Sequence, residues 1–273
     1  MSPIVTVARA LAASGLVPFE AQVLLAHVLD RDRAWLAAHA GDPIGAEQAK
    51  AFAGLARRRR DGAPVAYLIG RREFYGLDLQ ITTDVLIPRP ETELLVDLAL
   101  ARIPVDHGAQ VVDLGTGSGA VALAIASERR DAHVLGTDIS TAALALAARN
   151  AARLVITNVA FVVSDWLAAL PRGRFDLIAG NPPYVAAGDP HLGEGDLRYE
   201  PVQALTPGRD GLNAIRGIVA DAPRYLVPGG WLLLEHGHDQ ADAVAALFLG
   251  AGFADVGSAR DLAGILRVSY GRI

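Results

Sequence analysis

The sequence contains no cysteine. A chain without thiols forms no disulfide bond and offers no thiolate to a metal ion. The absence agrees with a reducing compartment, where disulfides are rare. We therefore expect no disulfide framework and no metal centre in this protein.

Long apolar runs are absent as well. No uninterrupted apolar stretch approaches the ~20 residues that a helix needs to span a bilayer. The first 22 residues are amphipathic and do not form a signal sequence, because Arg9 and Glu20 interrupt their apolar residues. These absences predict a cytoplasmic protein with no membrane partner.

Positive charge is scarce outside the first part of the chain. The 273 residues are 52% hydrophobic and carry a net charge of −5, enough apolar residues for one large domain or two unequal ones. Residues 1–75 carry 10 Lys and Arg against 7 Asp and Glu, and residues 76–273 carry 15 against 23. This acidic excess argues against direct nucleic-acid binding. The basic run Arg57–Arg60 is either a solvated helix end or a contact for an acidic partner.

The first part of the chain has helical periodicity. Apolar spacing of three and four residues predicts helices over 4–14, 18–30 and 45–60. Between Pro64 and Pro90 the period changes to alternation with glycines, including Tyr67-Leu68-Ile69-Gly70, which predicts extended chain and a β-hairpin between two domains. We expect a helical substrate-recognition domain over 1–75, a hairpin linker over 76–90 and a catalytic domain over 91–273.

The remainder of the chain alternates strands and helices, which predicts a mostly parallel α/β sheet covered on both faces. The final two strands leave no room for a helix between them, so the last strand should be antiparallel. Residues 185–211 form a long Gly- and Pro-rich loop, and such loops are usually functional. The predicted strands are 110–114, 133–137, 159–163, 175–180, 230–235, 253–258 and 265–270; the helices are 91–103, 118–129, 140–153, 212–226 and 239–249.

A glycine-rich turn, Gly115-Thr116-Gly117-Ser118-Gly119, follows the first of these strands. Its G-x-G-x-G spacing differs from the G-x-G-x-x-G of dinucleotide-binding turns. The glycines permit positive φ and a close approach of backbone to ligand. Asp113 could accept a hydrogen bond from a ligand ammonium, although a plain tight turn explains the glycines equally well.

The second and third strands end in polar residues that suit a nucleoside. Asp138 lies about 20 residues after the glycine-rich turn, where Rossmann-like folds bind ribose hydroxyls; alternatively it caps the helix from Ser140. After the third strand, Asp165 could accept from an adenine amine and Trp166 or Val163 could stack on the ring, or Trp166 is a core residue. A nucleoside site without a diphosphate turn favours S-adenosylmethionine over NAD.

The fourth strand ends in Asn181-Pro182-Pro183-Tyr184. The two prolines stiffen the turn, and the asparagine amide brings one acceptor and two donors. Together with the flat tyrosine ring, this set suits gripping a planar NH2 group.

Over residues 90–273 the chain resembles class I S-adenosylmethionine-dependent methyltransferases. Among these, Asn181–Tyr184 resembles the [DN]-P-P-[YF] signature of the enzymes that methylate planar nitrogens. Across nearly its whole length it resembles the peptide chain release factor N(5)-glutamine methyltransferase family (HemK/PrmC). The motifs that carry this resemblance are Ile87–Glu93, Asp113–Gly119, Arg198–Pro201, Ala204-Leu205, Gly208–Leu212, Pro228–Gly230 and Leu234–Gly237.

The resemblance implies a Rossmann-like seven-stranded sheet with a small N-terminal helical domain. It also implies methyl transfer from S-adenosylmethionine, leaving S-adenosylhomocysteine, to the side-chain N5 of the glutamine in the Gly-Gly-Gln motif of release factors. The implied cofactor residues are Gly115, Thr116, Gly117, Ser118, Gly119, Asp138, Trp166 and Asn181, with Glu91 and Thr92 near the methionine part. The implied substrate-amide residues are Asn181, Pro182, Pro183 and Tyr184, of which Asn181, Pro182 and Tyr184 are catalytic.

For the chemistry, we expect the Asn181 side-chain oxygen and the Pro182 carbonyl to accept the two amide hydrogens, with Tyr184 packed on the amide plane. His236 and His238 are interpreted as structural residues and receive no role as base or metal ligand. Three alternatives stay open: a ribosomal-protein glutamine methyltransferase, a DNA N6-adenine methyltransferase, and a nucleoside-binding module without catalysis. The acidic residues 76–273 argue against the DNA enzyme.

Overall fold

The structure is a computed structural model that describes residues 5–105, 108–193 and 195–273. Its described residues form two compact units. The first comprises those of Met1–Arg71 and Glu194–Tyr199, and the second those of Arg72–Gly193 and Glu200–Ile273. Part of the loop predicted over 185–211 therefore packs with the helical unit.

The first unit is a small helical bundle. Its core is formed by apolar side chains spaced three and four apart, among them Leu24, Leu25 and Phe52. The three predicted helices are confirmed, and two shorter ones are added. The helices are α1 (Val7–Ala13), α2 (Pro18–Leu29), α3 (Arg33–Ala38), α4 (Ala46–Arg60) and α5 (Val65–Ile69).

The prediction that Tyr67–Ile69 is extended was wrong, because these residues lie in α5. A five-residue helix is too short to show a periodic pattern, and Leu68 is directed into the helical core. Helix α3 was missed for the same reason, since it has six residues. Asp32 marks its start, because the Asp32 side chain accepts from the Trp35 amide at 2.7 Å.

The hairpin consists of β1 (Arg71–Phe74) and β2 (Leu77–Gln80). Its two connecting residues, Tyr75 and Gly76, have φ of 52° and 73°. Positive φ at both positions is the geometry of the type I′ turn, whose twist matches that of the paired strands. The hairpin begins before the boundary expected at residue 76, and residues 81–89, all of them described, contain no strand.

The second unit is built on a seven-stranded sheet in the order β5-β4-β3-β6-β7-β9-β8. The pairs among β3, β4, β5, β6 and β7 are parallel, and β9 runs antiparallel to both β7 and β8, as predicted. The Rossmann-like fold class is therefore confirmed. The strands are β3 (Gln110–Leu114), β4 (His133–Asp138), β5 (Val159–Val163), β6 (Phe175–Gly180), β7 (Leu226–Glu235), β8 (Ala254–Arg260) and β9 (Leu266–Arg272).

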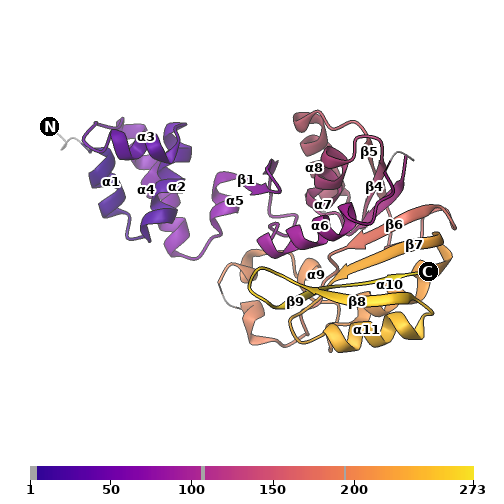
Figure 1. The fold of residues 1–273 in the computed structure, drawn as a ribbon. Coiled ribbons are helices and arrows are strands. Elements are labelled where there is room, and N and C mark those ends of the chain that lie inside the picture. The colour runs from indigo at the N-terminus through magenta and orange to yellow at the C-terminus, as the bar shows by residue number, and fades with distance from the viewer. Residues whose placement is uncertain (1–4, 106–107, 194) are drawn as a thin grey trace. The chain divides into compact units, whose positions relative to one another are not determined.

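Helices cover both faces of this sheet (Figure 1). One face carries α6 (Glu93–Leu100), α7 (Ala120–Glu128) and α8 (Thr141–Leu154), and the other carries α10 (Asn213–Asp221) and α11 (Ala241–Gly250). Helix α7 is buried from Ala120 to Ala126 because it packs against both the sheet and α6. Among the described residues, no helix combines the length and the apolar character needed to cross a membrane.

Short elements complete the connections around the carboxyl ends of the parallel strands. They are η1 (Pro90–Thr92), η2 (Pro190–Gly193), η3 (Leu197–Tyr199), α9 (Val202–Leu205) and η4 (Ala222–Arg224). The chain leaves β3 toward β4 on one side and returns through β6 on the other, so the strand order reverses between β3 and β6. Open α/β sheets bind ligands at this reversal, outside the carboxyl ends of the strands.

Candidate active site

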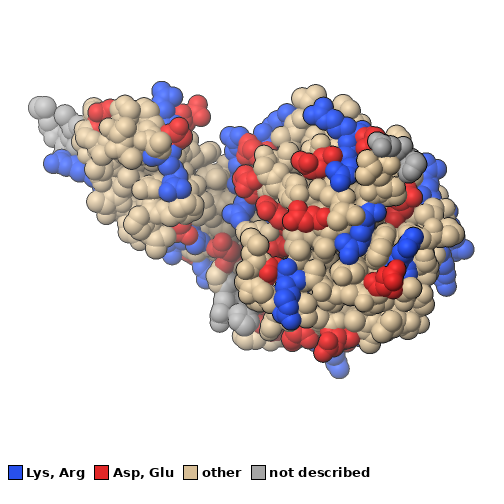
Figure 2. Space-filling model, in the orientation of Figure 1, with Lys and Arg blue, Asp and Glu red and all other residues tan. Residues whose placement is uncertain are grey.

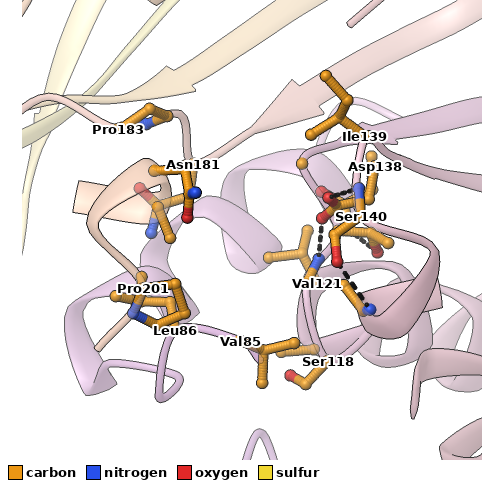
Figure 3. Close-up of a pocket in the computed structure, with 18 of the residues that line it drawn as sticks. Val85, Leu86, Ser118, Val121, Asp138, Ile139, Ser140, Asn181, Pro183 and Pro201 are labelled. Carbon is orange, nitrogen blue, oxygen red and sulfur yellow. Dashed lines mark hydrogen bonds between the residues drawn. The ribbon is translucent and has the colours of Figure 1, made fainter. Parts of the chain in front are cut away.

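A cavity of about 600 Å³ opens at this reversal of strand order, a size typical of a small-molecule site. Figure 3 shows Asn181 and Pro183 on one side of it, and Asp138, Ile139 and Ser140 on the opposite side. The sequence-predicted residues that line the cavity are Thr92, Asp113, Gly115, Thr116, Gly117, Ser118, Asp138, Asp165, Trp166, Asn181 and Pro183.

The glycine-rich turn forms the floor of the cavity beside β3. Gly115 and Gly117 have φ of 68° and 54°, a region that L side chains rarely adopt. A Cβ on Gly115 would lie 3.3 Å from the Trp166 ring. The Gly117 amide donates to Asp138 Oδ2 at 3.0 Å, so the backbone itself holds the acid that ends β4.

Asp138 is fixed by two backbone donors, because Oδ1 also accepts from the Ser140 amide at 2.9 Å. The side chain that caps α8 is Ser140, whose Oγ accepts from the Ala143 amide at 3.2 Å. The capping alternative for Asp138 is therefore wrong. Each carboxylate oxygen keeps a further lone pair that can accept from a ligand hydroxyl.

Asp113 lies deeper, and 2% of it is exposed. Both of its hydrogen bonds fall on Oδ2, from Thr116 Oγ1 at 2.6 Å and from the Ala122 amide at 3.1 Å. Burial raises the pKa of this carboxyl to about 7, and the charge of Asp138 acts in the same direction, while the two hydrogen bonds oppose the rise. A cationic ligand beside Asp113 would favour its ionised form.

Asp165 and Trp166, which follow β5, also line the cavity. Trp166 is half-buried with φ of 49°, and its ring packs against the core of the second unit while it lines the cavity. Trp166 is therefore both a residue of the core and a residue of the cavity wall. Sequence reasoning missed Ile139, which is 70% exposed at the cavity edge; its place directly after Asp138 was the available signal.

On the opposite side, the Asn181 side chain is held by a single directed hydrogen bond. Its Nδ2 donates to the buried Thr92 Oγ1 at 3.1 Å. This bond uses one N–H of the Asn181 amide, so Oδ1 remains available to accept a hydrogen bond. Thr92 lines the cavity and Glu91 is outside the lining residues. Although Thr92 precedes α6, its hydroxyl makes no capping bond with the described helix.

Tyr184 occupies a position that the sequence did not predict. Its ring packs against the core of the second unit and its hydroxyl donates to Glu235 Oε1 at 3.1 Å. Gln240 Nε2 donates to the Tyr184 carbonyl at 3.1 Å. Neither Tyr184 nor the buried Pro182 is among the described lining residues, and the same is true of Gly119.

Glu235, the last residue of β7, was missed as a site residue. It is fully buried, and Oε2 has no hydrogen-bond partner among the described residues. Burial raises the pKa of Glu235 to about 7, against the nearby hydroxyls of Thr92 and Tyr184, which lower it. Burial and the Glu235 charge also raise the pKa of Tyr184. A carboxylate ending an otherwise apolar strand was the signal in the sequence.

An ion pair lies at the edge of the cavity. Arg89 Nη2 lies 2.5 Å from Oε1 of Glu200, a carboxyl that is buried. The pair holds the segment before α9 against residues 87–89, and Pro201, Gln203 and Ala204 then line the cavity. Both Arg89 and Glu200 lie within the motifs that carry the family resemblance.

Of the two histidines after β7, His236 has the structural position that the sequence predicted, and His238 is exposed. His236 is buried, with Nδ1 2.8 Å from the Gly237 carbonyl and Nε2 2.9 Å from Ser269 Oγ. Burial lowers the pKa of this imidazole, so the neutral form is favoured. Within the described ranges, no group of His, Asp and Glu side chains is arranged to hold a metal ion.

Two sequence families match the chain, the PrmC N-terminal domain over residues 5–70 and the methyltransferase small domain over residues 91–194. The release factor glutamine methyltransferase of Burkholderia pseudomallei is 53% identical over 98% of this chain and 96% of its own length. That of Xylella fastidiosa is 52% identical over 93% of this chain and 92% of its own.

Among solved structures, a methyltransferase from Pyrococcus furiosus matches with a TM-score of 0.55. The match covers 79% of this chain and 96% of the other, at 19% identity, which supports the fold alone.

Proposed function

The chain belongs to the release factor glutamine methyltransferase family, whose members are S-adenosylmethionine-dependent enzymes, and from that premise we propose how its site works. The proposed reaction transfers a methyl group to the side-chain amide nitrogen of the glutamine in the Gly-Gly-Gln motif of a peptide chain release factor. The observation that carries the proposal is the Asn181 amide, tied through Nδ2 to Thr92 with Oδ1 left as its acceptor.

The cavity residues fit an adenosyl cofactor. Asp138, already oriented by the Gly117 and Ser140 amides, accepts from the ribose hydroxyls. Trp166 and Ile139 provide apolar contacts for a ring, and Asp165 accepts from its amine. Asp113 carries the charge that suits an ammonium. The remaining contacts come from the backbone of the glycine-rich turn, where the positive φ of Gly115 and Gly117 disfavours any residue with a side chain.

A primary amide is a weak nucleophile because its nitrogen lone pair is delocalised into the carbonyl. When bound, S-adenosylmethionine supplies a methyl group already activated by its sulfonium. In the proposed mechanism, Asn181 Oδ1 and the Pro182 carbonyl accept the two N–H groups of the glutamine amide. These acceptors orient the nitrogen and stabilise the positive charge that develops on it. The methylated nitrogen then loses its proton to water.

The decisive test supplies purified release factors and S-adenosylmethionine with a tritiated methyl group. We expect label on the release factor, and mass spectrometry should place one methyl group on the glutamine of Gly-Gly-Gln. Label on ribosomal proteins or DNA, with none on release factors, would replace the proposed substrate. The Asn181→Ala variant provides the matched control for chemistry at this site.

For partners, we propose contact with the release-factor protein and not with nucleic acid. On the visible face of the second unit, acidic and basic residues are interspersed (Figure 2). A phosphate backbone is bound by a basic stripe, whereas this distribution suits a protein surface. We place the reaction in the cytoplasm, which fractionation of cells expressing the tagged chain would test.

Recognition of the intact release factor is proposed to involve the helical domain over residues 1–75. Two arginines of the basic run are engaged inside the first unit. Arg59 pairs with Glu20 at 2.7 Å and with Asp196 at 2.8 Å. Arg60 donates to the Ser14 carbonyl. Arg57 and Arg58 are exposed at the end of α4, and these two are the proposed contacts for an acidic surface.

A further inference from the structure

Glu235 has a buried position with an incomplete set of hydrogen bonds. Glu235 is the last residue of β7. The residue before it, Leu234, pairs with Gly180 of β6, which directly precedes Asn181. One oxygen accepts from Tyr184, and the other is buried with no partner among the described residues. A buried carboxyl left in this state carries a large desolvation cost, so its position calls for a functional explanation.

The side chains around this carboxyl link it to Asn181. The Thr92 hydroxyl is near enough to the Glu235 carboxyl to lower its pKa, although the described residues show no hydrogen bond between the two, and the buried Oε2 is left open to this hydroxyl. The same Thr92 oxygen accepts from Asn181 Nδ2 at 3.1 Å. Tyr184, the last residue of the Asn181–Tyr184 turn, donates to Glu235 directly. Tyr184 is therefore bonded to this carboxyl directly, and Asn181 is bonded to the hydroxyl that lies near it.

The direction of these hydrogen bonds follows from the charge of Glu235. An ionised carboxyl only accepts, so a Thr92 hydroxyl turned toward Oε2 gives its single proton to it and offers lone pairs to Asn181. The Asn181 amide must then present its NH2 to Thr92. Resting on the function proposed above, we propose that Glu235 is a positioning residue whose ionised carboxyl sets the direction of the Glu235–Thr92–Asn181 chain and so turns Asn181 Oδ1 toward the substrate amide.

Protonation of Glu235 would remove this constraint. A neutral carboxyl can donate to Thr92, and the Thr92 hydroxyl can then donate to Asn181 Oδ1. The Asn181 amide would rotate and present NH2 to the cavity. Two NH2 groups would then face each other, and the glutamine nitrogen would lose one of its acceptors. Methyl transfer should therefore require ionised Glu235.

The charged and titratable groups around Glu235 come from three other segments. They are Tyr184 after β6, Glu91 on η1 and Arg267 on β9. Glu91 raises the pKa of Glu235 and Arg267 lowers it, but burial dominates and places the value at about 7. Arg267 is itself 3.3 Å from Asp261. The turnover rate should therefore be full above this pKa and fall as the pH decreases through it.

The test measures kcat on a short Gly-Gly-Gln peptide from pH 5.5 to 9, with peptide and cofactor saturating, so that changes in cofactor affinity do not contribute. Wild type should lose activity on the acid side with a midpoint near 7. Glu235→Gln should be slower at pH 8 by about tenfold, because its amide fixes no hydrogen-bond direction. It should also lack the loss of activity at acid pH, the acid limb of the pH profile. An unchanged acid limb in this variant would overturn the proposal.

Two further variants keep Glu235 and change Thr92. They test the proposal even if Glu235→Gln does not fold. Thr92→Ser retains the hydroxyl and should retain both rate and acid limb. Thr92→Val removes it and should lose the limb and most of the rate. The exposed Glu128 at the end of α7 is the matched control, and Glu128→Gln should behave as wild type. Equal pH profiles for Thr92→Ser and Thr92→Val would refute the inference.

A second measurement does not depend on the substrate. In protein labelled with ¹⁵N asparagine, the side-chain NH2 signal of Asn181 should shift with pH around 7 in wild type and stay constant in Glu235→Gln. If this shift is seen but glutamine is not methylated, the positioning network stands and the proposed substrate fails. If glutamine is methylated but the Asn181 signal does not respond to pH, the positioning role of Glu235 fails.

Discussion

A buried carboxyl lies on each side of the cavity, Asp113 among the lining residues and Glu235 outside them. Burial raises the pKa of both to about 7, but their hydrogen bonds differ. On the cofactor side, formed by the residues after β3 and β4, Asp113 accepts from Thr116 and a helix amide on the same oxygen. On the transfer side, formed by Thr92, Asn181–Tyr184 and Glu235, one oxygen of Glu235 accepts from the Tyr184 hydroxyl, and the other has no partner in the described part of the chain.

The difference lies in whether hydrogen bonds can reverse. Backbone amides only donate, so Asp138, held by two of them, has a fixed arrangement on the cofactor side. Hydroxyls and side-chain amides can both donate and accept. The orientation of Asn181 therefore depends on the charge of Glu235. The cofactor side therefore keeps one arrangement of hydrogen bonds, whereas the arrangement on the transfer side changes with the protonation of Glu235.

The largest expected effect comes from breaking the transfer side at Asn181. Asn181→Ala should lower kcat by about 10²–10³-fold, comparable to losing one preorganised hydrogen-bonding group at a reacting centre. Cofactor affinity should fall as well, because Asn181 lies between the two sites, but less than kcat, because the residues after β3 and β4 are unchanged. Single-turnover kinetics and calorimetry measure the two quantities. Near-normal methylation would contradict the proposed mechanism, and a circular dichroism spectrum checks that the variant folds.

The reverse result is expected on the cofactor side. Asp138→Ala should weaken cofactor binding by about 10–100-fold, because hydrogen bonds to a charged group contribute about 1.5–3 kcal/mol. The turnover rate at saturating cofactor should fall less. Calorimetric titration measures the affinity, with Asp221→Ala as an exposed-carboxyl control. Unaltered affinity in Asp138→Ala would remove the ribose role of this residue.

Asp113 gives a stability difference that depends on pH. Its pKa is raised in the folded protein from 3.8 to about 7, so the wild type loses stability as the pH rises through that window. Asp113→Asn keeps one acceptor oxygen for Thr116 and Ala122 without the charge. Relative to wild type, it should gain about 1–3 kcal/mol of unfolding free energy between pH 5 and pH 8. Denaturant unfolding at both values measures this, and an equal difference at both would contradict the raised pKa.

The smallest expected effect leaves both sides of the cavity untouched. The double substitution Arg57→Glu and Arg58→Glu should raise KM severalfold for an intact release factor, since exposed charges contribute about 0.2–1 kcal/mol each. It should not alter KM for a short Gly-Gly-Gln peptide. The control is Arg9→Glu, another exposed arginine of the first unit. Equal changes for peptide and intact factor would refute a docking role.

Much of the second unit could be predicted from sequence, because buried parallel strands are near-continuous apolar runs and their ends are marked by polar residues. The predicted strands 110–114, 159–163 and 175–180 agree with β3, β5 and β6. The weak points were short elements such as α3 and α5, where five or six residues give no period. The packing of the described residues 195–199 with the helical unit had no sequence signal, since it depends on contacts between distant segments.

The sequence by itself determined the fold class, the family and the positions at which polar residues follow the strands. Those properties depend on local pattern and on motif spacing, which are read along the chain. Only the tertiary structure decided that Ser140, not Asp138, caps α8, that Tyr184 is directed to Glu235, and that Asn181 donates to Thr92. The last two contacts join η1, the turn after β6 and the end of β7, and hydrogen-bond partners so far apart in the chain are set by packing. The Ser140 cap is local, but Asp138 lies close enough in sequence to compete for it, so only the observed geometry distinguishes them.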